Sequence, residues 1–153
     1  MIRLSREADY GIVLLAQFAC ESERLMHSAR KLSRETYLPF PMVSKVLKAL
    51  TRQGFLVSQR GVKGGYSLAR RPERITLAEI IGALEGPIAV TECTDTHSDC
   101  KHDSVCQLRP TWQKINAAVL LTLDKIALSD LIRTLPGQAG MQSGSPSDLV
   151  RLQ

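Results

Sequence analysis

A glycine-rich turn between two short β-prone runs is the feature that most limits how this chain of 153 residues can fold. The runs Phe55-Leu56-Val57-Ser58-Gln59-Arg60 and Tyr66-Ser67-Leu68-Ala69 are separated by Gly61-Val62-Lys63-Gly64-Gly65. Two such runs around a Gly-rich turn predict a β-hairpin. Elsewhere apolar residues recur at intervals of three and four, so the hairpin is predicted to belong to a mainly α fold.

Three helices are predicted ahead of the hairpin, over about residues 5–20, 28–35 and 41–53. Ser5 and Ser28 stand where N-cap residues of the first two helices would accept hydrogen bonds from backbone amides. Pro41 suits the first turn of the third helix, and Gly54 suits its end. Helical spacing places Val43, Val46, Leu47 and Leu50 on the inner face of this third helix.

After the hairpin, the sequence predicts two more helices, joined by an irregular segment that carries cysteines. Thr76 and Glu79 have the spacing of a capping box, and Gly86-Pro87 ends the helix that they open. Pro110 begins a long amphipathic helix, whose apolar stripe consists of Trp112, Ile115, Val119, Leu123 and Ile126, widened by Leu120, Leu121 and Leu128. The predicted division is a first domain over 1–86, a cysteine-bearing loop over 87–109, a long amphipathic helix over 110–133 and a flexible tail over 134–153.

Charge is divided unevenly along the chain. Residues 1–75 carry 14 Lys and Arg against 6 Asp and Glu, a net of +8, whereas residues 76–153 carry 6 against 9, a net of −3. A basic front half favours a polyanionic partner such as nucleic acid, although a solvated basic surface has the same composition. Because the longest apolar runs are too short to cross a bilayer and no signal-peptide pattern opens the chain, we expect a cytoplasmic protein with no membrane partner.

The predicted elements follow one another in the order of a winged helix-turn-helix domain with a two-stranded wing. The third helix can enter the major groove with its polar face, and an arginine at the wing tip can enter a narrow minor groove. Each residue alone fits a solvated side chain or an ordinary turn equally well, but their joint order on the +8 segment favours binding of double-stranded DNA. The residues predicted to contact DNA are Ser28, Lys31, Ser44, Lys45, Lys48, Arg52, Arg60, Lys63, Gly64, Gly65 and Tyr66.

Several motifs make the chain similar to the IscR/NsrR-type family of winged-helix regulators, many of which sense iron–sulfur clusters. They are Arg60–Ala69 in the wing, Arg3-Leu4-Ser5…Asp9-Tyr10, Leu47…Leu50…Gly54-Phe55-Leu56-Val57 and Ile75–Ile80. The resemblance covers about residues 1–133 and implies homodimers that cross through the helix after Pro110 and bind partly palindromic operators. Within the family, the chain looks closest to regulators of the SUF assembly operon. Ser44 stands where cluster-biogenesis regulators often carry an acidic residue that reads bases, so the operator sequence cannot be carried over.

Three of the four cysteines, Cys93, Cys100 and Cys106, are spaced C-x6-C-x5-C in the irregular segment. Thiolates are soft ligands, and three of them on one loop can converge on an iron–sulfur cluster or on zinc. The resemblance implies that these three hold a cluster, with 2Fe-2S favoured over 4Fe-4S. It also offers Asp9 of the partner subunit as the fourth ligand, in balance with a plain role as a first-turn helix acid. The alternatives for that position are Glu7, His97 and His102, and Cys20 is interpreted as a buried, inert thiol.

The sequence therefore predicts a dimeric, cluster-dependent transcriptional regulator, which the resemblance links to genes of iron–sulfur cluster biogenesis. Two alternatives keep the DNA-binding domain: a structural zinc site completed by His97 or His102, or a metal-free thiol switch. The chain has no phosphate-binding loop, no nucleophile elbow and no plausible Cys–His–acid set. We expect no enzymatic activity and no small-molecule substrate.

Overall fold

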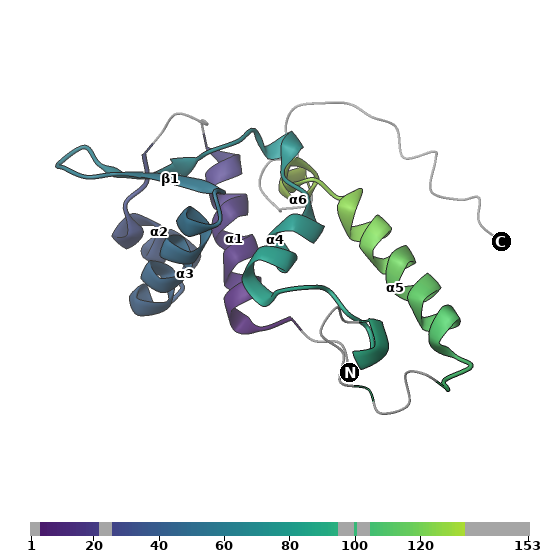
Figure 1. Cartoon of the computed structure of the whole chain (residues 1–153). Coiled ribbons are helices and arrows are strands. Elements are labelled where there is room, and N and C mark those ends of the chain that lie inside the picture. Colours follow the sequence, from purple (N-terminus) through teal and green to yellow (C-terminus); the bar gives the residue numbers. More distant parts are fainter. Residues whose placement is uncertain (1–3, 22–25, 95–99, 101–104, 134–153) are drawn as a thin grey trace.

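The computed structural model describes residues 4–21, 26–94, 100 and 105–133. Its elements in order are α1 (Arg6–Cys20), α2 (Ala29–Thr36), α3 (Phe40–Arg52), β1 (Leu56–Gln59), β2 (Gly65–Leu68), η1 (Pro72–Arg74), α4 (Leu77–Glu85), η2 (Glu92–Thr94), α5 (Arg109–Asp124) and α6 (Leu128–Arg133). Figure 1 shows α1 to α4, α6 and the hairpin gathered into one body, from which α5 extends as an arm. The predicted mainly helical fold with a two-stranded wing is confirmed, while the predicted tail lies outside the described residues.

The predicted caps of the first two helices are confirmed. Ser5 Oγ accepts a hydrogen bond from the Ala8 amide and Ser28 Oγ accepts one from the Lys31 amide, each at 3.2 Å. These bonds satisfy amides that have no partner within the helix, so the side chains fix where α1 and α2 begin. After α3, Gly54 has a φ of +79°, a backbone conformation that favours glycine and that ends the helix.

The wing is an antiparallel hairpin in which Leu56 pairs with Leu68 and Gln59 with Gly65. Two further backbone hydrogen bonds fix it to the chain just before α2. The His27 amide donates to the Tyr66 carbonyl at 2.8 Å, and the Tyr66 amide donates to the His27 carbonyl at 2.9 Å. The base of the wing is therefore held against the three-helix unit by main-chain bonds as well as by side-chain packing.

One apolar core joins the body together. Fully buried side chains reach it from α1, α3, α4 and α6, including Leu14, Leu47, Ile80 and Leu128. The predicted capping box is present, because Thr76 Oγ1 accepts from the Glu79 amide while the Glu79 carboxylate accepts from the Thr76 amide. Among the described helices, none is both long and apolar enough to span a membrane.

The prediction of one continuous helix over 110–133 is wrong at its C-terminal end. α5 ends at Asp124, and α6 is a separate helix that packs on α1. Neither glycine nor proline marks the break. Instead, two hydrogen bonds join the break between α5 and α6 to the start of α4. The Leu77 amide donates to the Ile126 carbonyl and the Leu128 amide donates to the Ile75 carbonyl, each at 2.8 Å. Leu128, predicted on the dimerisation stripe, is consequently part of the main core.

Candidate nucleic-acid interface and cysteine site

Helix α3 presents a basic outer face beside a fully buried inner one. Its four predicted inner residues are completely buried, whereas Lys45, Lys48 and Arg52 are exposed and Ser44 is half-buried between the two faces. Lys45 Nζ lies 2.7 Å from a carboxylate oxygen of Glu7 on α1, while Lys48 and Arg52 form no ion pair within the described part of the chain. Lys48 and Arg52 are thus the positively charged side chains of α3 that have no carboxylate partner among the described residues.

Lys31 and Ser28, both predicted to contact DNA, have structural partners. Lys31 Nζ lies 3.0 Å from Glu21, 3.5 Å from Glu35 and 3.4 Å from Nδ1 of the buried His27. Its ammonium group is therefore held between two carboxylates and an imidazole. The hydrogen bond between Lys31 and Glu21 lowers the pKa of the Glu21 carboxyl and raises the pKa of Lys31. Ser28 is the N-cap of α2. The positive charge of Lys31 is therefore balanced by the carboxylates of Glu21 and Glu35 within the protein.

The wing tip presents two basic side chains and one apolar one. Arg60, Val62 and Lys63 are all exposed, and Val62 is completely so. Figure 1 shows the turn of the hairpin extending away from the body, where it is open to a partner. A basic hairpin tip of this kind is suited to a narrow minor groove, where the negative potential is enhanced.

The two glycines of the predicted DNA-contact set have a packing role. A Cβ at Gly64 would lie 2.2 Å from the Gln59 carbonyl oxygen, and one at Gly65 would lie 2.6 Å from the His27 carbonyl oxygen. Gly65 also has a φ of +153°. Tyr66 follows and makes the bridge to His27 that anchors the wing. The close approach of backbone to backbone is thus sufficient reason for glycine at both positions.

The three cysteines of the predicted cluster site lie between α4 and α5. Cys93 is in η2, with its Sγ 3.2 Å from Thr91 Oγ1, and Cys106 ends the segment, where its carbonyl accepts the Arg109 amide that starts α5. Cys100 lies between them in the sequence, and all three thiols are half-buried. Among the described residues, the three sulfur atoms do not lie close enough together to hold one metal ion, so the structure does not bring the predicted ligands into one site. As partly exposed soft donors, they keep the chemistry that an iron–sulfur cluster or zinc requires.

The residues predicted as possible fourth ligands differ in whether their side chains already have a partner in the structure. Asp9 is exposed on α1, and its carboxylate forms no ion pair with any described residue, whereas Glu7 is paired with Lys45. His97 and His102 lie outside the described residues. Cys20 is half-buried rather than buried; burial and the neighbouring Glu21 raise its pKa, which keeps the thiol protonated and less reactive.

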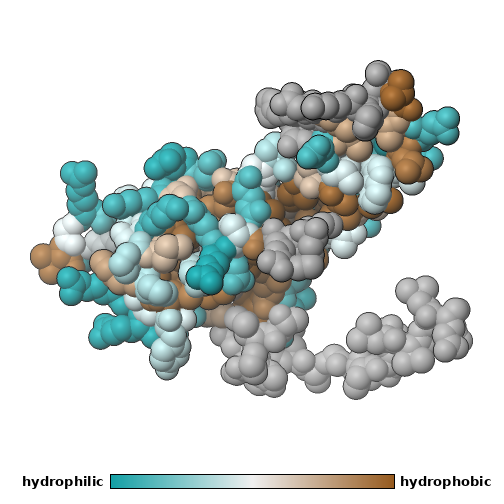
Figure 2. Space-filling view, turned by 90° about the horizontal axis from the view of Figure 1, so that it is seen from below, coloured by the Kyte–Doolittle hydropathy of each residue, from teal (hydrophilic) through white to brown (hydrophobic). Residues whose placement is uncertain are grey.

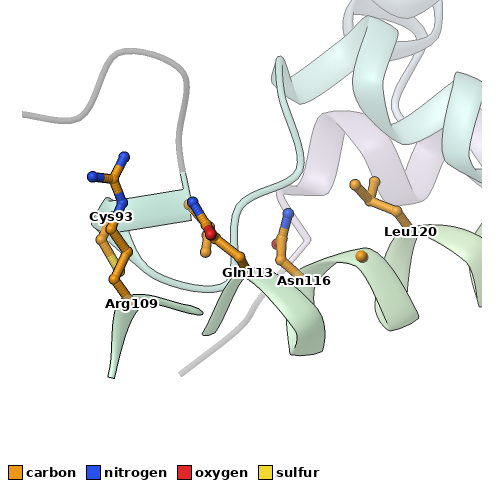
Figure 3. Close-up of a pocket in the computed structure, with 7 residues that line it drawn as sticks. Cys93, Arg109, Gln113, Asn116 and Leu120 are labelled. Carbon is orange, nitrogen blue, oxygen red and sulfur yellow. The ribbon is translucent and has the colours of Figure 1, made fainter. Parts of the chain in front are cut away.

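A pocket of about 230 Å³ connects the first cysteine to α5, and it is lined by Cys93, Thr94, Arg109, Gln113, Asn116, Ala117 and Leu120. Figure 3 shows Gln113, Asn116 and Leu120 following one another along α5 on the side that faces this pocket. Asn116 is 8% exposed, donates to the Ile88 carbonyl at 3.2 Å and accepts from the Val90 amide at 2.9 Å. It therefore holds the cysteine-bearing segment against α5. The sequence signal for this role is a polar residue within the apolar stripe.

The remaining surface of α5 is largely uncovered. Asn116 is its one buried residue, although the helix has 16 residues. A shallow apolar groove of about 370 Å³ is lined by Ile115, Ala118, Val119, Thr122 and Leu123. Figure 2 shows hydrophobic atoms along the arm that α5 forms. Three of the five predicted stripe residues, Ile115, Val119 and Leu123, thus lie together on this open groove.

Comparison with known proteins agrees with the elements described above. A family model described as "Rrf2: Iron-dependent Transcriptional regulator" matches residues 4–134, a range that includes α1 to α6, the wing and the three cysteines. The chain belongs to the Rrf2 family. Rrf2 proteins are DNA-binding transcriptional regulators rather than enzymes, which confirms the predicted class and the absence of an enzymatic role.

Individual Rrf2 relatives are distant but cover most of the chain. Protein rrf2 of Nitratidesulfovibrio vulgaris is 26% identical over 132 residues, spanning 86% of this chain and 88% of the relative. The structure of CymR, the global cysteine regulator of Bacillus subtilis, covers 88% of this chain and 99% of its own at 27% identity and a TM-score of 0.71. The structure of T. potens IscR covers 94% of both chains at 24% identity and a TM-score of 0.69, which shows a shared fold. The suspected resemblance to IscR/NsrR-type regulators is confirmed at the level of the family.

Proposed function

We propose that this Rrf2 protein is a homodimeric regulator that binds a double-stranded DNA operator and senses the state of an iron–sulfur cluster. The observation that supports the proposal is the presence of three half-buried thiols, Cys93, Cys100 and Cys106, in the part of the sequence between α4 and α5. A segment with three thiolate donors is fixed in one conformation when a metal centre binds all three. The proposed target genes, those of iron–sulfur cluster biogenesis, follow from the sequence resemblance.

DNA recognition is assigned to α3 and the wing. Lys48 and Arg52 supply unpaired positive charge on α3, and Arg60 and Lys63 supply it at the wing tip. Lys45 keeps 63% of its side chain exposed beside Glu7, so its ammonium has donors left for a phosphate. Ser44 is half-buried on α3, at the edge between its buried and exposed faces, where a hydroxyl can reach either a base or a phosphate.

The cluster is assigned to the three cysteines with Asp9 of the partner subunit as the fourth ligand. Asp9 is preferred to Glu7 because the Glu7 carboxylate is already paired with Lys45, whereas the Asp9 carboxylate has no ion pair in the described part of the chain. A bound cluster would supply redox and iron-dependent chemistry that thiols alone lack. A carboxylate ligand is weaker than a fourth thiolate for iron in a cluster, which suits a sensor that must lose or alter its cofactor.

Two contacts support coupling between the cluster site and the DNA-binding surface. The Ser5 amide, at the start of α1, donates to the Glu85 carboxylate at the end of α4. The cysteine-bearing segment follows α4 directly and is bound to α5 through Asn116. Metal bonds to the three cysteines would therefore fix α4 relative to α5, and hence the separation of two recognition helices in a dimer paired through α5.

The test is purification under anaerobic conditions, with iron and sulfide analysis, an absorption spectrum, and selection of bound duplexes from a random DNA library. We expect a visible chromophore with stoichiometric iron and sulfide, and a change in affinity for the selected duplex when the cluster is removed. Colourless protein that contains zinc would support the structural zinc alternative instead. Metal-free protein whose DNA affinity changes with thiol oxidation would support the thiol switch. DNA binding without any dependence on metal or redox state would contradict all three sensing hypotheses.

A further inference from the structure

A groove on the outer side of α2 carries two arginines that the predicted DNA-contact set does not include. It has a volume of about 560 Å³ and is lined by Arg30, Ser33, Arg34 and Phe40. Arg30 and Arg34 are four residues apart, so they stand on the same face of α2. The guanidinium carbon of Arg30 lies 5.8 Å from the centroid of the Phe40 ring at the start of α3, within the range of a cation–π contact.

The base of this groove is held in place by the turn between the two helices. Ser33 Oγ donates to the Leu38 carbonyl at 2.6 Å, which connects α2 to the residues just before α3. Phe40 is 44% exposed, so its ring supports Arg30 without covering it. The Arg30 guanidinium therefore lies on a fixed surface, so less of its side-chain freedom is lost on binding, and Arg34 stands beside it on the same face of α2.

Arg30 and Arg34 differ from the lysine between them in having no carboxylate partner. Within the described ranges, neither arginine forms an ion pair, whereas Lys31 is bound by Glu21 and Glu35. α2 thus has two charged faces: one is neutralised inside the protein, and the other presents two free guanidinium groups beside the start of α3.

We propose that this groove binds a phosphate of the DNA backbone, and that Arg30 and Arg34, rather than Lys31, are the DNA contacts of α2. The inference rests on the proposed DNA-binding function and extends it to residues outside α3 and the wing. In a helix-turn-helix, the helix that precedes the recognition helix crosses the DNA backbone. Guanidinium groups present paired donors that match phosphate oxygens.

The shape of the groove favours a phosphate within a polymer over a small free anion. Of the described residues that line it, Arg30, Arg34 and Phe40 are exposed, and Ser33 is half-buried with its hydroxyl already donating to Leu38. Sites for small ligands bury most of the ligand surface and fix it with several converging polar groups. An open groove with two guanidinium groups at one edge instead suits a strand that lies across it.

The test uses a double variant of the groove that carries both Arg30→Gln and Arg34→Gln. Its control is a second double variant, with both Lys125→Ala and Arg133→Ala, which also removes two positive charges but from the C-terminal part of the chain. Affinity is measured for a mixed-sequence duplex and for a duplex selected from a random library, over a range of salt concentrations. We expect the groove variant to bind both duplexes more weakly by the same factor. Its plot of log affinity against log salt should flatten by about 0.9 for each phosphate that the variant no longer neutralises. The control should match wild type.

Other results would overturn the inference in distinguishable ways. Unchanged affinity and salt slope in a groove variant with wild-type circular dichroism would show that the groove does not touch DNA. Loss of binding to the selected duplex alone would assign the arginines to base recognition instead. Saturable binding of inorganic phosphate that the variant loses, with DNA affinity unchanged, would make the groove a free-anion site. If wild type itself bound no duplex at any salt concentration, the proposed function would fail first.

Discussion

The body of the molecule and the α5 arm contrast in what covers their apolar side chains. In the body, α1, α3, α4 and α6 contribute completely buried residues to one core, including Leu14, Leu47 and Leu128. In α5, the one buried residue is Asn116, and Leu121 is 62% exposed. Apolar burial is the main stabilising term in folding. The body therefore contains its own source of stability, whereas α5 leaves much of its apolar surface uncovered.

In the proposed sensor, this difference would separate the folding unit from the part that responds to the cluster and to the second subunit. A region with a complete core keeps its shape when a ligand or partner leaves. A helix with an open apolar face, bound to a cysteine-bearing segment by the two hydrogen bonds of Asn116, is sensitive to what binds beside it. Low local stability is the condition under which metal binding or dimerisation can alter a structure.

The largest effect is expected from removing a core side chain in the body. Leu47→Ala deletes a fully buried side chain from α3 and should lower the free energy of unfolding by about 2–5 kcal/mol. For the monomer, measured at a protein concentration below the dimer dissociation constant, the matched change Leu121→Ala on the exposed face of α5 should cost about 0.5 kcal/mol or less. Urea denaturation monitored by circular dichroism measures both. Similar losses in the two variants would mean that α5 is as well buried in solution as the body.

A charge on the α5 groove should act on assembly instead of on the body. Val119→Asp places a carboxylate in the proposed dimer contact, where it would be buried without a partner. We expect the dimer dissociation constant to rise roughly 100-fold, about 2.8 kcal/mol at 1.4 kcal/mol per tenfold. Analytical ultracentrifugation measures this change, and Lys114→Asp on the same helix is the control. A wild-type monomer at micromolar concentration would contradict the dimer assignment.

Asn116 offers a way to loosen the contact between the two regions. Asn116→Ala removes both side-chain bonds to the segment before Cys93 and should cost about 1–2 kcal/mol locally. We expect faster loss of the visible chromophore in air, with the unfolding of the body unchanged. Asn116→Asp keeps the acceptor for the Val90 amide and should be intermediate. Wild-type chromophore lifetimes in both variants would show that this contact does not support the cluster site.

The body was predictable from the sequence because its signals are local. Serine caps, the Thr76–Glu79 capping box and the glycine-rich turn each set a boundary through contacts a few residues apart, and the structure has all of them. The end of α5 was not predictable in this way, since no local signal marks it. It depends on hydrogen bonds from Leu77 and Leu128 across the fold.

The candidate site also has a part that local signals in the sequence predict and a part that depends on contacts across the fold. Periodicity correctly placed Lys48 and Arg52 on the outer face of α3. The same reasoning could not show that Lys31 meets Glu21, a residue ten positions earlier on a different element, because that pairing depends on how α1 and α2 pack. The i, i+4 spacing of Arg30 and Arg34 was a signal available in the sequence, and its meaning became apparent only with the Phe40 ring in place.

The smallest effect concerns Lys31 and Lys48. The sequence predicted a DNA contact for both, but their structural surroundings indicate different roles. Lys31→Met removes the hydrogen bond that lowers the pKa of Glu21 in the folded state. A lowered carboxyl pKa contributes stability above the ordinary carboxyl pKa, and this contribution is lost as pH falls through the lowered value. The variant should therefore be slightly less stable than wild type at neutral pH and equally stable in acid. Urea denaturation at the two pH values measures this difference.

Lys48→Met provides the matched comparison, because Lys48 is exposed on α3 without an ion pair in the described part of the chain. Its removal should leave stability unchanged at both pH values and weaken DNA binding, with a flatter salt dependence. Lys31→Met should leave DNA binding at the wild-type level, since its charge is already balanced by Glu21 and Glu35. If the two variants weakened DNA binding equally, the carboxylates would not hold Lys31 away from the phosphates. The neutralised face of α2 would then have to be reassigned to the DNA interface.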